Sequence, residues 1–267
     1  MMALERVRGE LLGLTSRLPT AATFTLRRFA ARGGLDERLI DGWGIALDDG
    51  TDLRAYREPE PARDSPWLAF IEQRRIRTRL LVSHIRHATR GAVTLANTQP
   101  FAREIGGRMH CFAHNGCLEG IERRYELSGS RFLPLGQSDS EFAACLLFDR
   151  MARLWRQAHP PPLAHRLEVV AHFAAQMRAL GPSNFLYSDG LTLFGHGDRR
   201  MQADGRIGPP GLWQLRRRCA SDADALIEAG ITLETPGPAQ EIELLASVAL
   251  TGEENWRPLA EGEVIAV

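Results

Sequence analysis

Residues 83–91 read Ser-His-Ile-Arg-His-Ala-Thr-Arg-Gly and give the first indication of the fold. They continue the apolar run Leu80-Leu81-Val82, and residues 79–86 have the length and composition of a buried strand. Side chains alternate between the faces of a strand, so His84 and Arg86 are expected on one face. The planar guanidinium of Arg86 can pair with a ligand carboxylate through two parallel hydrogen bonds, although arginines also commonly bind carboxylates of the protein itself.

A second polar cluster, His114-Asn115-Gly116, ends another apolar segment. Residues 109–114 are predicted to form a strand that breaks at Asn115-Gly116. An amide side chain beside a glycine N–H offers two donors to an oxyanion, and the missing side chain lets a substrate approach closely. Asn-Gly is also the commonest turn of a β-hairpin, so the residues alone leave both interpretations open.

The third cluster, Ser138-Asp139-Ser140-Glu141, begins the clearest helix of the chain. Ser138 and Glu141 have the spacing of a capping box. In the first turn, Asp139 either accepts hydrogen bonds from a ligand ammonium or stabilises the helix dipole without any ligand. The apolar side chains of this helix recur at helical spacing and are expected in the core. They are Ala144, Leu147, Phe148, Met151, Leu154 and Trp155.

The remaining segments are mostly short strands. Residues 10–16 are predicted to form a strand, and residues 45–56 a hairpin after the turn Asp41-Gly42-Trp43-Gly44, whose glycines allow close backbone contact. Strands before and after a central pair of helices, without repeated strand–helix alternation, predict an α+β domain with a largely antiparallel sheet. Further helices are expected at 21–31, 65–72 and 164–180, and further strands at 184–187, 191–195, 212–215, 241–250 and 264–267.

Composition excludes some classes of function. The chain has 33 basic and 33 acidic residues, so no global field favours nucleic acid or an anionic membrane. No run of about twenty apolar residues occurs, which predicts that no segment crosses a membrane. The four cysteines are unevenly spaced, and we expect them to be free thiols in a reducing compartment. We therefore expect a cytoplasmic protein.

The three clusters, in this order and with Glu10-Leu11-Leu12-Gly13 and the turn at residues 41–44 upstream, resemble the class II glutamine amidotransferases. The similarity is strongest to the small stand-alone YafJ-like branch, and residues 188–190 and 250–256 extend it over nearly the whole chain. The resemblance implies an Ntn-hydrolase-like fold, a four-layer αββα sandwich of two mainly antiparallel sheets. It also implies a single domain over residues 9–267, with residues 1–8 as an amino-terminal extension.

The resemblance further implies roles for individual residues. Arg86 would hold the α-carboxylate of glutamine or a γ-glutamyl compound, with Thr89 adding a hydroxyl contact and Asp139 accepting the α-ammonium. His114 would belong to the same binding site, and Asn115 and Gly116 would form the oxyanion hole. Gln99 departs from the family, which commonly has histidine there. No cofactor is expected.

The family's nucleophile is an amino-terminal cysteine immediately before Glu-Leu-Leu-Gly, and here that position is Gly9. Glycine has no thiol, and the eight residues before it remove the free amine that serves as the base. Thr15 and Ser16 lie about 20 Å farther along the strand at roughly 3.3 Å per residue. Cys117, directly after the oxyanion pair, is a possible replacement nucleophile, and its alternative role is that of a small buried apolar group.

The spacing of Cys111, His114 and Cys117 also suggests a possible zinc site. Strand alternation sends residues 111 and 114 to opposite faces, and the sequence offers no evident fourth ligand. No metal is therefore expected.

Two functions follow from these residues. In the first, the chain is an amidotransferase that hydrolyses a glutamine or γ-glutamyl amide, impaired by Gly9, and any transfer would need an acceptor domain or partner protein. In the second, it is a non-catalytic binding or scaffolding homologue that keeps the ligand pocket and works with a partner protein. A third explanation is that the natural gene product or a relative carries cysteine at position 9.

Overall fold

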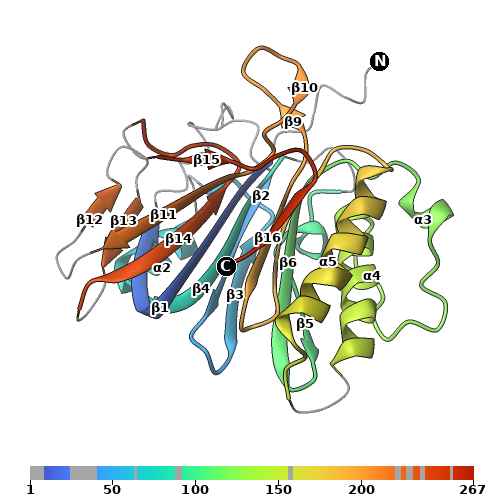
Figure 1. The fold of residues 1–267 in the computed structure, drawn as a ribbon, viewed down its shortest axis with the longest axis horizontal. Coiled ribbons are helices and arrows are strands. Elements are labelled where there is room, and N and C mark those ends of the chain that lie inside the picture. Colours follow the sequence, from blue (N-terminus) through green and yellow to red (C-terminus); the bar gives the residue numbers. More distant parts are fainter. Residues whose placement is uncertain are drawn as a thin grey trace.

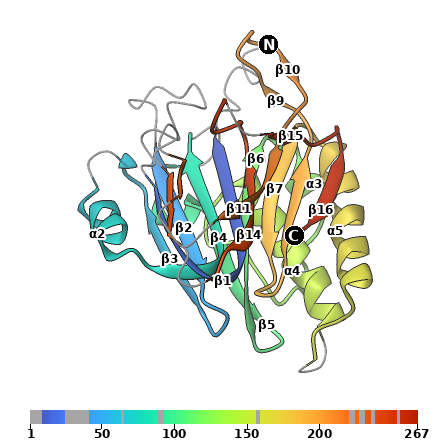
Figure 2. The same ribbon diagram turned by 60° about the vertical axis from the view of Figure 1, so that its left-hand side comes forward.

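The fold is a sandwich of two antiparallel sheets with helices on both outer sides (Figure 1). The computed structural model describes residues 9–24, 41–62, 65–87, 92–155, 159–219, 224–226, 231–234, 238–252 and 255–267. The turned view in Figure 2 separates the layers: helix α2 (Pro66–Arg74), the larger sheet, the smaller sheet, and then helices α4 (Asp139–Leu154) and α5 (Leu163–Arg178). This arrangement confirms the α+β, four-layer αββα prediction.

The larger sheet has the strand order β15-β11-β14-β1-β4-β2-β3, and β13 pairs with the end of β1 and with β12. Its centre is the antiparallel pairing of β1 with β4, which sets Leu11 opposite His84. The strands are β1 (Glu10–Phe24), β2 (Gly42–Asp48), β3 (Leu53–Glu58), β4 (Arg77–Arg86), β11 (Trp213–Cys219), β12 (Asp224–Leu226), β13 (Ile231–Glu234), β14 (Gln240–Ala246) and β15 (Arg257–Pro258).

The smaller sheet has the order β16-β8-β7-β6-β5. A separate hairpin of β9 and β10 projects from one end of the sandwich (Figure 1), and the helix α3 (Ile121–Arg124) and the 3-10 helix η4 (Leu95–Asn97) lie in connections. The strands are β5 (Phe101–Ile105), β6 (Arg108–Gly116), β7 (Ser183–Ser188), β8 (Leu193–Gly197), β9 (Arg200–Met201), β10 (Ile207–Gly208) and β16 (Glu263–Ala266).

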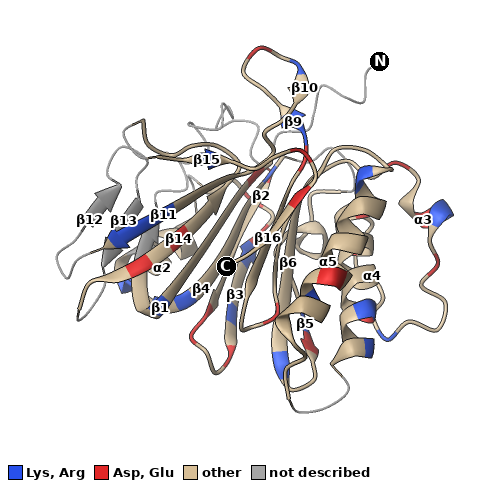
Figure 3. Cartoon of the chain, viewed as in Figure 1, with Lys and Arg blue, Asp and Glu red and all other residues tan. Residues whose placement is uncertain are grey.

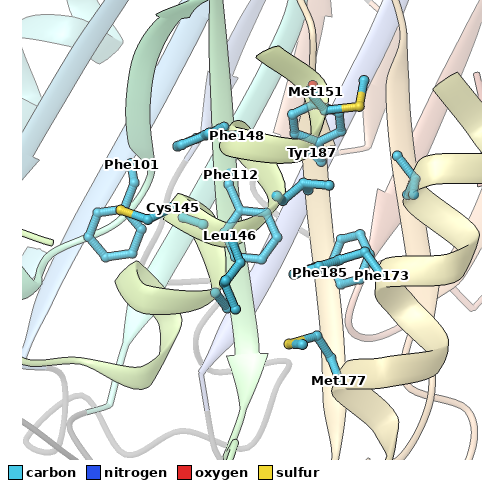
Figure 4. Close-up of a cluster of buried hydrophobic side chains, with 14 of the residues drawn as sticks. Phe101, Phe112, Cys145, Leu146, Phe148, Met151, Phe173, Met177, Phe185 and Tyr187 are labelled. Atoms are coloured by element: carbon cyan, nitrogen blue, oxygen red, sulfur yellow. The ribbon is translucent and has the colours of Figure 1, made fainter. Parts of the chain in front are cut away.

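Three apolar clusters hold the layers together. The first joins α2 to the outer face of the larger sheet, and the second lies between the two sheets. The third joins the smaller sheet to α4 and α5, where Phe112 and Phe185 on the strands meet Phe173 on α5 (Figure 4). Leu80 and Val82 of β4 belong to the cluster between the sheets, so alternation carries His84 and Arg86 toward the same interior at the end of the strand.

Most expected elements are present, and two expectations are wrong. Residues 21–24 continue β1 and pair with β13, so the helix expected at residues 21–31 does not begin there, and residues 25–40 lie outside the described part of the chain. The strand expected to break at Asn115-Gly116 instead runs through both residues, which pair with Asn184 and Ser183 of β7. In both places strand pairing with a remote segment overrides the local signal. No helix within the described ranges is both long and apolar enough to cross a membrane.

Gly44 provides the close backbone contact expected of the turn at residues 41–44. A Cβ built at this position would lie 2.0 Å from the backbone oxygen of Gln99. We expect Gly44→Ala to lower the free energy of unfolding by about 3 kcal/mol or more, because the obstructing atom belongs to the main chain and cannot rotate away. Urea unfolding measures this change. Gly208→Ala is the control, since nothing lies within 4 Å of a Cβ there, and equal losses in the two variants would contradict the steric explanation.

Candidate active site

The candidate site lies where β1 begins and where β4 and β6 end. Gly9 is buried immediately before β1, and the Asn115 side-chain amide of β6 donates a hydrogen bond to its carbonyl oxygen. A Cβ at position 9 would lie 3.1 Å from His84 Nε2, 3.1 Å from the backbone oxygen of Ile85 and 3.7 Å from Asn115 Cγ. The structure thus brings together Gly9, Asn115 and the end of β4.

Gly116 is held in a space that only glycine fits. A Cβ there would lie 2.0 Å from the backbone oxygen of Pro182 and 2.7 Å from His114 Nε2. The Asn115 carbonyl accepts a hydrogen bond from Asn184 Nδ2 at 3.2 Å. The Asn-Gly pair is therefore part of a buried strand, and the hairpin-turn interpretation is excluded.

Gln99 fixes the end of β6 with its side-chain amide. Its Nε2 donates to the carbonyl oxygen of His114 at 3.0 Å, and its Oε1 accepts from the N–H of His114 at 2.6 Å. The side chain thereby makes the two backbone hydrogen bonds that a neighbouring strand would make, one residue before Asn115. A carboxamide carries a donor and an acceptor side by side, which suits this bidentate contact.

Asn97 links the segments that carry Arg86 and Asp139. Arg86 Nη2 donates to the carbonyl oxygen of Ala92 at 3.2 Å, and Asn97 Nδ2 donates to the same oxygen at 2.9 Å. On its other side, Asn97 Oδ1 accepts from the N–H of Gln137 at 2.7 Å, two residues before Asp139. The end of β4 and the start of α4 therefore belong to one hydrogen-bond network.

Asp139 has structural partners in addition to its expected ligand. Its Oδ2 accepts from the N–H of Leu118 at 2.7 Å, and its Oδ1 accepts from the N–H of Ser140 at 2.9 Å. The first contact ties the segment after Gly116 to α4. Each carboxylate oxygen has a second lone pair, so the group can still accept hydrogen bonds from a ligand ammonium.

The capping box at the start of α4 is half formed. Ser138 Oγ accepts from the N–H of Glu141 at 3.2 Å, as expected of an N-cap. The Glu141 carboxylate instead accepts from the N–H of Gly136 at 2.7 Å and pairs with Arg103 at 3.1 Å. Glu141 therefore fastens the preceding loop and β5 to the helix.

The histidines of the site are neutral near pH 7. Burial lowers the pKa of His84 to about 3, and nearby His114 and Arg86 lower it further. Burial also lowers the pKa of His114 to about 4, against the opposing effect of Asp139. His114 packs on the helix side of β6 with its Nδ1 2.9 Å from Ser140 Oγ, whereas Cys111 lies in the core between the sheets. These two side chains lie on opposite faces of β6, as alternation predicts.

A buried ion pair supports the start of β1 from the other face of the sheet. Glu10 Oε1 lies 2.5 Å from Arg200 Nη2, and Arg200 Nη1 donates to the carbonyl oxygen of Ser247 at 2.7 Å. Ser247 Oγ accepts from the N–H of Leu11 at 2.9 Å. Burial raises the pKa of Glu10 to about 7, and this effect outweighs the opposing attraction of Arg200.

The other sequence candidates have different outcomes. Thr89 lies outside the described residues. Cys117 is half-buried, and its N–H donates to the carbonyl oxygen of Pro182 at 3.0 Å. The supporting roles of Asn97, Arg200 and Ser247 are not evident from the sequence. Asn97 lies two residues before Gln99, but nothing in the sequence pairs Arg200 or Ser247 with Glu10, because they meet only in the folded protein.

This sandwich, with polar residues gathered at the ends of β4 and β6 and the start of α4, is the architecture of the class-II glutamine amidotransferases. A family model of that description matches residues 8–267, so the chain belongs to this family.

Among known proteins, it is 32% identical over 254 residues to YafJ of Escherichia coli (strain K12), named as a glutamine amidotransferase, and the match covers 95% of each chain. A protein of Haemophilus influenzae with the same kind of name is 29% identical, over 96% of this chain and 83% of the relative.

Solved structures agree with this assignment. A crystal structure described as a predicted glutamine amidotransferase from Pseudomonas aeruginosa superposes with a TM-score of 0.69 at 29% identity, covering 96% of each chain. The allosteric regulatory enzyme of purine biosynthesis is 16% identical with a TM-score of 0.57, and the match covers 46% of that chain. This more distant likeness shows the fold alone.

We expect Gln99→Leu to lower the free energy of unfolding by about 2 to 4 kcal/mol, because it leaves the buried N–H and carbonyl of His114 without partners. Gln99→Glu keeps the acceptor for the N–H but loses the donor and buries a carboxylate, so it should also lower the free energy of unfolding. Urea unfolding checks both values. Gln137→Leu, at an exposed side chain next to the same network, is the control and should change stability little. A loss in Gln99→Leu no larger than in the control would contradict the bidentate contact.

The raised pKa of Glu10 predicts a pH-dependent stability. Between the ordinary carboxyl value of 4.5 and about 7, the folded protein keeps a proton that the unfolded chain releases. Raising the pH through this window therefore lowers the free energy of unfolding. Glu10→Gln should make the decline shallower, as measured by urea unfolding across the window. Glu126→Gln, at an exposed glutamate, should leave the slope unchanged, and an unchanged slope in Glu10→Gln would contradict the raised pKa.

Proposed function

We propose that this chain binds glutamine or a small γ-glutamyl compound at the candidate site, and that hydrolysis of the ligand amide is lost or strongly impaired. One observation carries the proposal. Gly9 lies immediately before β1 and has no side chain, and a Cβ there would lie 3.1 Å from His84 Nε2 and 3.7 Å from Asn115 Cγ. His84 and Asn115 therefore flank a position that has no nucleophile.

The charges of the site suit an α-amino acid. Arg86 supplies a guanidinium for the α-carboxylate, and Asp139 supplies carboxylate lone pairs for the α-ammonium. His84 and His114 add no charge, because burial lowers the pKa of each to about 3 and about 4 respectively. Arg86 and Asp139, whose segments are joined by the Asn97 network, supply the opposite charges that a zwitterion needs. The proposal assigns Thr89 a hydroxyl contact with the same ligand and places His114 beside the site.

The proposed chemistry separates binding from bond cleavage. In the family reaction a cysteine thiolate attacks the side-chain amide carbon, the oxyanion is stabilised by donors such as the Asn115 amide and the Gly116 N–H, and ammonia leaves. Gly9 has no atom to make this attack. Loss of a nucleophile costs on the order of a million-fold in turnover, so the remaining oxyanion donors would not sustain ordinary hydrolysis.

In this proposal the chain binds its ligand without cleaving it, and a partner protein uses the occupied pocket. Ammonia or acyl transfer would likewise need an acceptor domain or partner. Alternatively, Cys117 replaces the missing nucleophile. In that case Cys117→Ser should abolish any hydrolysis that the unmodified chain performs.

The test compares glutamine hydrolysis by the full chain with a variant that lacks residues 1–8 and begins at Gly9→Cys. Ammonia release should be near background for the full chain and should rise by at least a thousand-fold in the repaired variant. A Cβ at position 9 is tight against His84 Nε2, so His84 must shift by a few tenths of an ångström. The matched control, Gly9→Ala with the same truncation, has the same Cβ and no thiol. Robust hydrolysis by the full chain would refute the impairment.

Binding is tested separately by calorimetry with glutamine. Arg86→Ala should weaken binding at least ten-fold, because it removes the carboxylate partner. Arg131→Ala, at an exposed arginine that pairs with Glu104, should leave affinity unchanged. No binding by the full chain, or equal affinity in Arg86→Ala, would refute the assigned pocket.

A further inference from the structure

The opposite end of the sandwich contains a cavity of about 830 Å³. It opens between the two sheets, where residues of β1, β4, β11 and β14 face the β5–β6 and β7–β8 turns. Ser16 of β1 lines it, and Ser16 lies six positions after Glu10, a span of about 20 Å at roughly 3.3 Å per residue. The cavity is therefore separate from the candidate active site.

Four arginines line this cavity: Arg17, Arg79, Arg108 and Arg218. They come from four strands, β1, β4, β6 and β11, and Figure 3 shows basic residues at the corresponding ends of the sheets. Among the described residues, no carboxylate lies within ion-pair distance of any of the four. The chain contains no lysine, so its cations are all guanidinium groups that offer several donors in a plane.

The carboxylates of the cavity do not balance these arginines. Glu243 is occupied, since its Oε1 accepts from Arg216 at 2.6 Å and 3.0 Å and its Oε2 accepts from Gln214 at 2.7 Å. Asp48 Oδ1 accepts from the N–H of Gly50 at 2.6 Å. Glu241 lies opposite Arg218 in the strand register. Asp48, Glu241 and the main-chain carboxylate of Val267 therefore face four guanidinium groups, which leaves an excess of positive charge.

The shape of β1 contributes to the cavity. Its register against β4 shifts between Thr15 and Thr20, as in a β-bulge, and Arg17 lies within this irregular segment. Bulges redirect side chains and are common next to binding sites. A regular strand would continue its pairing with β4 at this point. The bulge interrupts the pairing, and Arg17 lines the cavity there.

We propose that this cavity binds a small molecule carrying two or more phosphate groups. Guanidinium forks arriving from several strands suit the oxygens of a tetrahedral phosphate, which accepts hydrogen bonds from several directions. A cavity of this volume has room for more than one phosphate. Among the described residues that line the cavity, none has an aromatic side chain on which a nucleobase could stack, so the ligand class is a sugar bisphosphate or a short polyphosphate.

The test is calorimetry on the full chain at low ionic strength, with tripolyphosphate and fructose 1,6-bisphosphate as probes. At least one probe should bind saturably with one molecule per chain, and the double variant Arg17→Gln/Arg218→Gln should weaken that binding at least ten-fold. Glu241→Gln should strengthen it, because it removes an opposing carboxylate. These side chains are exposed, so the substitutions leave the core intact.

The matched control is Arg131→Gln/Arg153→Gln, which removes the same charge at two exposed arginines outside the cavity. It should leave affinity for the phosphate probes unchanged. Equal weakening in the two double variants, or no saturable binding of either probe, would refute the site. Citrate is the carboxylate probe, and tighter binding of citrate than of both phosphate probes would refute the ligand class.

Discussion

The hydrogen bond from the Asn115 amide to the carbonyl of Gly9 joins the two sheets at the candidate active site. Around this contact, Arg200 and Ser247 hold the start of β1, and Gln99 holds the end of β6. Each support comes from a segment remote in sequence. The site is therefore a property of the way the two sheets meet, and a change in either sheet would alter it.

Backbone proximity is the second constraint on this region. Gly44 lets the segment around Gln99 lie against β2, and Gly116 lets the end of β6 lie against Pro182. Both glycines occupy strands, where their cost in conformational entropy is offset by contacts that no side chain would permit. The same closeness surrounds Gly9, which explains why restoring a side chain there requires His84 to move.

The two ends of the sandwich differ in charge and hydration. At the candidate site, burial lowers the pKa values of two histidines and raises that of Glu10, so protonation is controlled by exclusion of water. At the other end, four arginines line an open cavity. The strands β1, β4 and β6 run from one end to the other, so one framework provides a buried recognition site and a solvent-facing basic cavity.

Apolar periodicity and compact motifs are local properties, so the α+β class, most strands, the cap at Ser138 and the family could all be predicted from the sequence. The sequence did not determine the strand state of residues 21–24 or of Asn115-Gly116, since pairing with remote β13 and β7 decided these. Only the tertiary structure revealed the bidentate contact of Gln99 and the Glu10–Arg200 pair. Such contacts join residues far apart in the chain, and their energies depend on burial that exists only after the sheets have packed.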